Sequence, residues 1–202
     1  MSLLRKWFGA SQDEIWRQLS LEIGADYTAE FWTGKKVQAQ HGEWTITLDN
    51  FVLSTGKSAI PFTRLRAPFV NQDGFTFVIF RKQIFADLAR WFGMQDIEIG
   101  HPEFDEAFVI QGNDEKKVRA LLASAKVREL IQAQPSILLS VRGDQGWFSR
   151  IYPEGVDELY FQVGGVVRDL DLLKKLFDLF ALTLDQLCLI GSAYEKDPGV
   201  KL

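Results

Sequence analysis

The sequence predicts an α+β fold in which a mainly antiparallel β-sheet carries helices packed on its faces. Two patterns lead to this fold class. In the first half, short segments rich in β-branched and aromatic residues are separated by brief turns that contain glycine, and such short connections join antiparallel neighbours. In the second half, residues 170–191 are apolar around most of a helical circumference, which indicates a long buried C-terminal helix.

We expect residues 1–202 to form a single globular unit of about ten strands and five helices, since no linker rich in proline, serine or glycine separates the halves. The alternative is a weak subdivision into two segments. Residues 1–95 would hold an N-terminal helix plus an antiparallel meander, and residues 102–194 would form a β-α-α-β-β-β-α segment.

The first expected helix begins with a capping box at Ser11-Gln-Asp-Glu14, where the Ser11 hydroxyl accepts the Glu14 amide and the Glu14 carboxylate reaches back. Gly24 follows its apolar face, at the position where a left-handed residue ends a helix. The strands expected next cover residues 27–32, 35–40, 43–53, 57–66 and 74–81, and a further helix covers residues 83–92.

The second half is expected to begin at His101-Pro102, with a strand at residues 107–111. Asn113 is the expected cap of a helix, and a shorter helix covers residues 126–134. Strands at residues 136–142, 146–152 and 158–167 come next, and Asp169 caps the last helix.

Composition limits the kind of partner and the compartment. The formal net charge of −4 and a pI of about 5.3 disfavour nucleic acid, so no nucleic-acid partner is expected. The single cysteine, Cys188, excludes an internal disulfide and any cysteine-rich zinc site. It suits a reducing compartment, so we expect a cytoplasmic protein.

No apolar run approaches the roughly 20 residues of a membrane-spanning helix, and residues 1–9 lack the apolar core of a secretory signal. The same nine residues nevertheless suit peripheral contact with a membrane surface. They place Leu3, Leu4, Trp7 and Phe8 around Arg5 and Lys6. A terminus packed on the domain is the other interpretation.

The residues from Pro102 onward resemble a family of bacterial proteins known only as a domain of unknown function. The resemblance covers about 85–90 residues, mostly core positions. It is carried by Phe104-Asp-Glu-Ala-Phe-Val-Ile110, Asn113-Asp-Glu115, Val118-Arg-Ala-Leu-Leu122, Leu159-Tyr-Phe-Gln-Val163 and the leucine-rich last helix. It implies a soluble, uncharacterised bacterial protein with no established activity, and it transfers no catalytic residue.

We assign no catalytic residue and no cofactor from the sequence. The two histidines, His41 and His101, lie in predicted turns, and no Gly-x-Ser-x-Gly elbow accompanies them. Neither a P-loop nor a Gly-x-Gly-x-x-Gly pattern occurs. Cys188 lies between leucines of the last helix, where apolar surroundings raise the pKa of a thiol and make it inert.

An acidic stretch around His101 is the candidate metal site. Its ligands would be Asp96, Glu98, His101, Glu103 and Asp105. Carboxylate oxygens with one imidazole suit Mg²⁺, Ca²⁺ or Mn²⁺, although the spacing matches no EF-hand loop. A plain acidic surface is the alternative.

The candidate partner-binding surface combines arginines with an aromatic ring: Arg64, Arg66, Phe69 and Arg81. If the strands at residues 57–66 and 74–81 pair, the arginines gather near one edge, and the loop at residues 67–73 exposes Phe69 beside them. Guanidinium groups bind carboxylates and phosphates, so the partner would be a protein or a small anionic ligand. Basic side chains that cover the solvated face of a sheet are the alternative.

Three functions follow from these observations. The preferred hypothesis is a non-enzymatic binding or interaction module, because the sequence is rich in aromatic residues and lacks a catalytic set. The second is a carboxylate- or metal-dependent hydrolase that uses the acidic residues near His101. The third is a peripheral membrane-associated regulator that uses residues 1–9.

Overall fold

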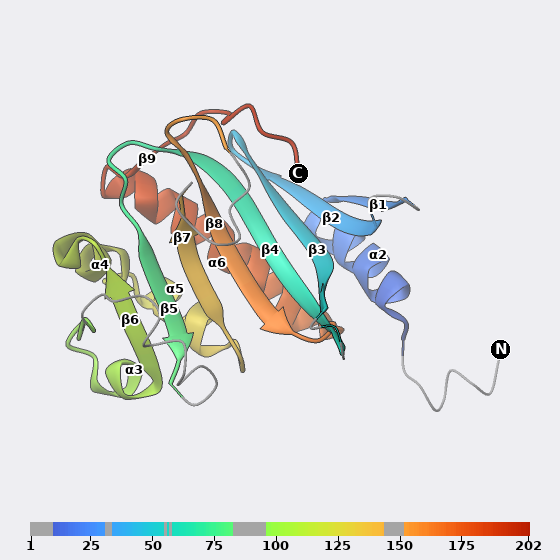
Figure 1. Cartoon of the computed structure of the whole chain (residues 1–202), viewed down its shortest axis with the longest axis horizontal. Helices are drawn as coiled ribbons and strands as arrows, with labels where there is room; N and C mark the ends of the chain where they lie inside the picture. The colour runs from blue at the N-terminus through green and yellow to red at the C-terminus, as the bar shows by residue number, and fades with distance from the viewer. Residues whose placement is uncertain (1–9, 31–33, 55, 57, 83–95, 144–151) are drawn as a thin grey trace.

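The computed structural model describes residues 10–30, 34–54, 56, 58–82, 96–143 and 152–202, and it confirms the α+β fold with a mainly antiparallel sheet (Figure 1). Within these residues the sheet has nine strands, and its eight strand pairings are all antiparallel. Across the sheet the strands follow the order β1 (Asp26–Glu30), β2 (Gly34–His41), β3 (Trp44–Ser54), β4 (Ala59–Asn71), β8 (Val156–Gly164), β7 (Leu138–Arg142), β5 (Phe77–Arg81) and β6 (Phe108–Gly112). The short strand β9 (Ala193–Tyr194) pairs with the end of β4.

Five helices are described: α2 (Gln12–Ile23), α3 (Pro102–Ala107), α4 (Glu115–Leu121), α5 (Ala125–Gln132) and α6 (Leu170–Leu189). The expected helix at residues 83–92 and most of the expected strand at residues 146–152 lie outside the described residues. No helix among the described residues combines the length and apolar character needed to cross a membrane.

The strands from the two halves of the sequence are interleaved in this sheet. β4 pairs with β8, so that Leu65 lies opposite Phe161, and β5 lies between β6 and β7. Because the β4–β8 pairing joins segments about 100 residues apart, the core is built by both halves together.

The long helix α6 covers one face of the sheet, as Figure 1 shows. Its cap is the predicted one, since the Asp169 carboxylate accepts the Leu172 amide at 2.9 Å. Its buried side includes Leu176, Leu179 and Phe180, which share one apolar core with residues of β3, β4, β7 and β8. We call this the core face of the sheet.

The capping box of α2 is also confirmed. The Ser11 hydroxyl accepts the Glu14 amide at 3.2 Å, and the Glu14 carboxylate accepts the Ser11 amide at 3.0 Å. Gly24 ends the helix with a φ of 66°, a conformation that side chains other than glycine rarely adopt. Trp16 and Leu19 then enter the core beside α6.

Several local expectations were wrong. Asp114, rather than Asn113, caps α4, because Asn113 instead bonds to the backbone of Gly74 and Thr76. The strands at residues 57–66 and 74–81 do not pair with each other, since β8 and β7 lie between β4 and β5. β4 continues through residues expected to form a loop, because pairing with β8 and β9 extends it to Asn71. The helix α3 was not expected.

Leu176 offers a test of how central α6 is to stability. Its side chain is 2 % exposed in the core, so Leu176→Ala should lower the free energy of unfolding by about 2–5 kcal/mol. Leu189, on the same helix, is 76 % exposed, and Leu189→Ala should change the free energy by less than about 0.5 kcal/mol. Urea denaturation of both variants makes the comparison, and equal effects would show that α6 is peripheral.

Candidate functional site

Side chains on the face opposite α6 form a buried group of charges. Along β4, Arg64 and Arg66 alternate with Leu65 and Ala67, which belong to the main core, so the arginines lie on the opposite face. This second face also holds a small apolar cluster of its own: Val78, Phe80, Val109, Leu138 and Tyr160. We call Asp49, Arg64, Arg66, Arg142 and Glu158 the arginine belt.

Asp49 is the acceptor for two guanidinium groups of the belt. Arg66 Nη2 lies 2.5 Å from one carboxylate oxygen of Asp49, and Arg64 binds the carboxylate through two nitrogens. Arg64 stands in register with Asp49 across β3 and β4, which explains the paired contact. Asp49 and Arg66 are both buried, so this charge pair is removed from water.

Glu158 extends the belt onto β8. It accepts a hydrogen bond from the Tyr152 hydroxyl at 2.5 Å and lies 3.8 Å from Arg66. Burial raises the pKa of Glu158 above its usual value, although Tyr152 and the neighbouring arginines oppose that shift. Arg142 lies opposite Glu158 in register, with its guanidinium 3.4 Å from the centre of the Tyr160 ring, and burial lowers the pKa of Arg142.

The arginine and aromatic surface expected from the sequence does not assemble as a whole. Arg64 and Arg66 do lie together, but both bind Asp49. Phe69 is fully buried in the main core, so the expectation that it is exposed was wrong. Arg81 lies on β5, three strands and therefore about 14 Å from β4. There its guanidinium donates to the carbonyls of Gln132 and Gln134, at the end of α5.

The acidic stretch around His101 forms backbone caps. The Asp105 carboxylate accepts the amides of Ile99, Gly100 and His101 at 2.9–3.0 Å. Asp96 accepts a hydrogen bond from Gln111 at 2.8 Å. Glu98 and Asp105 line an open hollow with Lys82 and Glu106, among other residues, whereas Glu103 lies exposed in the first turn of α3. Over the part of the chain that the structure describes, no three His, Cys, Asp or Glu side chains come close enough to share a metal ion.

His41 makes a polar contact that the sequence did not suggest. Its Nε2 lies 2.8 Å from a carboxylate oxygen of Asp185, and its ring stacks on Trp44. Within the described residues, no hydroxyl or thiol hydrogen-bonds to His41, so the pair joins β2 to α6 without forming a triad. Cys188 is only partly buried at the edge of the core, and burial raises the pKa of its thiol.

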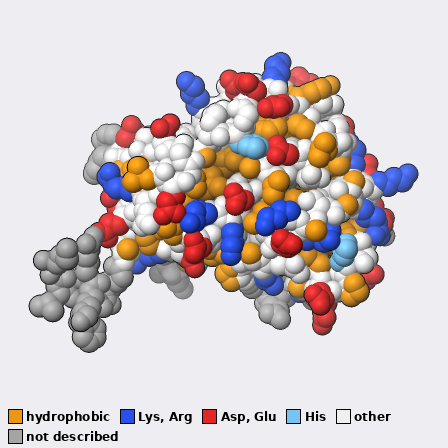
Figure 2. Space-filling model, turned by 180° about the vertical axis from the view of Figure 1, so that it is seen from behind, with side chains coloured by type: hydrophobic (Ala, Val, Ile, Leu, Met, Phe, Trp, Pro, Cys, Tyr) orange, Lys and Arg blue, Asp and Glu red, His pale blue; other side chains and the backbone are white. Residues whose placement is uncertain are grey.

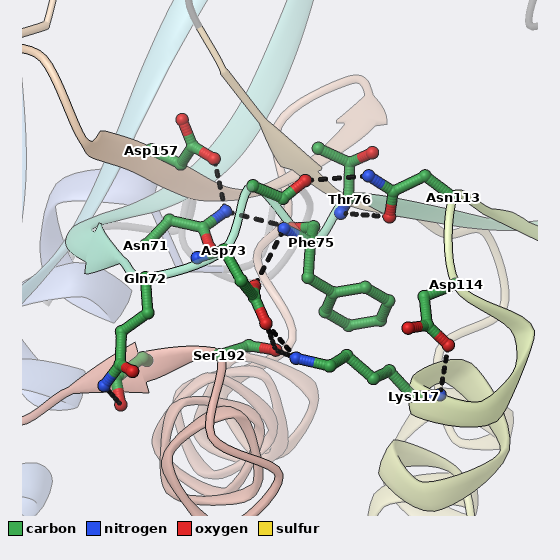
Figure 3. Close-up of polar contacts among 12 residues, drawn as sticks. Asn71, Gln72, Asp73, Phe75, Thr76, Asn113, Asp114, Lys117, Asp157 and Ser192 are labelled. Carbon is green, nitrogen blue, oxygen red and sulfur yellow. Dashed lines mark hydrogen bonds and ion pairs between the residues drawn. The ribbon is translucent and has the colours of Figure 1, made fainter.

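A polar network joins the loop after β4 to α4 and to the end of α6 (Figure 3). Lys117 forms an ion pair with Asp73 and donates to the Ser192 hydroxyl at 2.9 Å. Although partial burial opposes it, hydrogen bonds from Lys117 and from the Phe75 amide lower the pKa of Asp73. Ser192 is fully buried, so no substrate can reach its hydroxyl. The network therefore has a structural role, which is to connect these three segments.

The free end of the β3–β4 hairpin is the most apolar exposed feature of the described residues. We call residues 50–54 and 59–62 the hairpin end. Six large apolar side chains are exposed in the described chain, and three of them lie here: Val52 at 61 %, Leu53 at 39 % and Ile60 at 42 %. By contrast, side chains of both charge signs are interspersed over the α6 side of the molecule (Figure 2).

Two stacked rings hold the base of the hairpin end. Phe51 and Phe62 are cross-strand partners with ring centres 5.2 Å apart, and the Arg64 guanidinium lies 5.0 Å from the Phe51 ring. Pairing of β2 with β3 stops at Asp49, and pairing of β8 with β4 starts at Thr63. Apart from the contact of Pro61 and Phe62 with Gly165, the hairpin end is therefore a two-stranded ribbon, and in Figure 1 it reaches past the end of β2.

Sequence reasoning did not select the hairpin end, although a signal was present. Residues 50–63 contain a single charged residue, Lys57, in a chain in which 25 % of residues are charged. The acidic members of the arginine belt, Asp49 and Glu158, also went unrecognised, because only the register of β3, β4 and β8 brings them to the arginines.

Comparisons with models of protein families, with curated proteins and with solved structures find no match for this chain. The resemblance suggested by the second half therefore adds no functional information, and any function has to be argued from the geometry of the chain itself.

Asp49 provides a test of the arginine belt. Asp49→Asn keeps the shape of the side chain but removes the buried carboxylate that two guanidinium groups share, and it should lower the free energy of unfolding by about 3–5 kcal/mol. The exposed pair Glu115–Arg119 is the control, and Glu115→Gln should cost less than about 0.5 kcal/mol. Similar values for both variants in urea denaturation would show that the belt is solvated.

The raised pKa of Glu158 predicts a pH dependence of stability. In the unfolded chain the carboxyl titrates near 4.5, whereas the folded protein holds the proton to higher pH. Stability should therefore fall as the pH rises from about 4.5 through the higher pKa of the folded state, because the folded state binds more protons over that interval. Glu158→Gln should flatten the dependence, measured by urea denaturation between about pH 4 and 8. Parallel curves for the two proteins would contradict this assignment.

Proposed function

We propose that this protein is a non-enzymatic binding module that docks an uncharged, apolar surface of a partner protein through the hairpin end. The concentration of exposed apolar side chains on this two-stranded ribbon carries the proposal. Leu53 and Ile60 are cross-strand partners on the same face as the paired rings of Phe51 and Phe62, so these four side chains form a contiguous patch, and Val52 is exposed on the other face of the ribbon. Contiguous exposed apolar side chains on a water-soluble surface mark sites of protein association.

The scarcity of charged residues around the hairpin end favours a protein, rather than a membrane surface, as the binding partner. Peripheral membrane binding combines apolar insertion with clustered lysine and arginine that attract anionic lipids. Here Lys57 is the only charged residue in residues 50–63, and the nearby Arg64 is paired with Asp49. An uncharged patch gains from burial against another apolar protein surface without leaving an unpaired charge.

Side-chain contacts hold the base of the hairpin end, which favours specific binding. The stacked rings and the Asp49–Arg64 contact fix the ribbon where it leaves the sheet. A surface that is already ordered loses less conformational entropy when it binds. We further propose that the protein works in the bacterial cytoplasm. The resemblance of the second half to a family of bacterial proteins suggests a bacterial origin. The single, partly buried Cys188 suits a reducing compartment.

Photo-crosslinking in the source cells tests this proposal. A benzoylphenylalanine placed at Leu53 should form one discrete protein adduct, and the same group at Leu21 should not. Leu21 is the matched control because it is 84 % exposed on α2 and does not belong to the hairpin end. Adding Ile60→Glu should reduce the Leu53 adduct about tenfold or more, because docking would bury an unpaired carboxylate.

Ile60 is largely exposed, so Ile60→Glu should leave the urea midpoint close to that of the parent protein. Equal adducts at Leu53 and Leu21, or a Leu53 adduct insensitive to Ile60→Glu, would rule out the hairpin end as the docking surface.

A further inference from the structure

The two edges of the hairpin end differ in their free backbone groups. On the β4 side, the Pro61 carbonyl accepts the Gly165 amide at 2.7 Å, and proline has no amide hydrogen to offer. Phe62 also forms a bridge with Gly165. The β4 edge is therefore occupied by the segment that follows β8, and it cannot accept a new strand.

The direction of the Pro61 carbonyl also fixes the orientation of its partner on β3. In an antiparallel pair, the amide and carbonyl of one residue point to the same side of the strand. Because the Pro61 carbonyl points toward Gly165, Pro61 and Val52 form a pair without mutual hydrogen bonds. The amide and carbonyl of Val52 consequently point away from β4, and those of Asn50 and Ser54 do so by alternation.

No strand among the described residues pairs with this β3 edge at residues 50–54. The edge carries no charge and no proline, which are the usual devices that prevent edge pairing. The other edges of the sheet are protected. β1 carries Asp26 and Glu30, and β6 is covered where the Ile97 amide donates to the Ile110 carbonyl at 2.8 Å.

We propose that the partner at the hairpin end is a second copy of this chain, which adds its own β3 edge antiparallel to the first across a two-fold axis at Val52. This inference rests on the proposed function and names its partner. A strand that pairs with itself brings each residue against a residue of the same short segment, so any charge there would meet a like charge or an apolar side chain. Residues 50–54, Asn-Phe-Val-Leu-Ser, avoid this conflict.

A two-fold axis at Val52 would pair the outward backbone groups of both copies and bring their apolar side chains into contact. Val52 meets its own copy, and Asn50 meets Ser54 of the other copy, which gives a ladder of about six hydrogen bonds from the outward amides and carbonyls. On the second face of the sheet, Phe51 meets Leu53 of the other copy. The apolar patches of the two copies then join into one stripe across four strands.

The contact is small, so the dimer should be weak. Five residues per copy fall short of the roughly 20–30 residues a side that a standard interface contains, and we expect a Kd of about 1 µM or weaker. Sedimentation velocity from about 1 µM to 1 mM should therefore show the mass rise from 23.0 kDa toward twice that value. Val52→Pro removes the central outward amide and should weaken association about tenfold or more, whereas Val52→Thr keeps the ladder and should retain it.

Cysteine cross-linking tests the position of the axis and does not depend on the proline variant folding. In a Cys188→Ser background, Val52→Cys places one cysteine on each of the two facing strands. The Cα atoms of the two cysteines would lie about 5.5 Å apart, a separation that suits a disulfide. Ser54→Cys places its two copies about 14 Å apart along the strands, too far to bridge. Leu21→Cys reports random collision, since Leu21 is exposed elsewhere.

A disulfide dimer at position 52 but not at positions 54 or 21, with a concentration-dependent mass, is the expected result. A monomer at every concentration overturns the inference, and so does equal cross-linking at position 54 or 21. If Leu53 forms an adduct with a different protein in cells and the protein is a monomer in sedimentation, the partner is not a second copy. That result would still support docking through the hairpin end.

Discussion

The register of β4 is the constraint on which the rest of the structure depends. Its thirteen residues pair with β3, β8 and β9, so its alternation of side chains sets which face of each neighbour is buried under α6. Leu65 and Phe69 lie in the main core, while Arg64 and Arg66 lie on the opposite face. A slip of one residue would turn both arginines into the apolar core, so the charges and the apolar residues specify the same register.

The arginine belt shows that the part of the second face around Asp49, Arg66 and Glu158 is buried without being apolar. Taking Asp49 and Arg66 out of water carries a desolvation cost that their contact offsets only if both are present. The raised pKa of Glu158 points the same way, because burial outweighs the attraction of nearby cations. The arginine belt therefore contributes more to selecting the strand register than to the free energy of unfolding.

The hairpin end departs from the rules that the rest of the sheet obeys. At β1 the sheet edge carries charge, at β6 the edge is covered, and most apolar side chains of the sheet are buried on one face or the other. Beyond Asp49 the β3 edge has neither a paired strand among the described residues nor these protections, while the apolar pattern continues. Local departures of this kind are expected at functional sites, because a surface selected for association cannot also be optimised for isolation in water.

The sequence alone determined the features that depend on neighbours in the chain. The capping box at Ser11, the cap at Asp169, the apolar circumference of α6 and the alternating strands are local patterns of three to twenty residues, and the fold class follows from them. Only the tertiary structure decided which strands meet. The pairing of β4 with β8, the burial of Phe69, the separation of Arg81 from Arg64 and the exposed edge at Val52 all depend on contacts between segments far apart in sequence. No local periodicity encodes the order of strands across a sheet, because every strand with one apolar face satisfies the same pattern wherever it is placed.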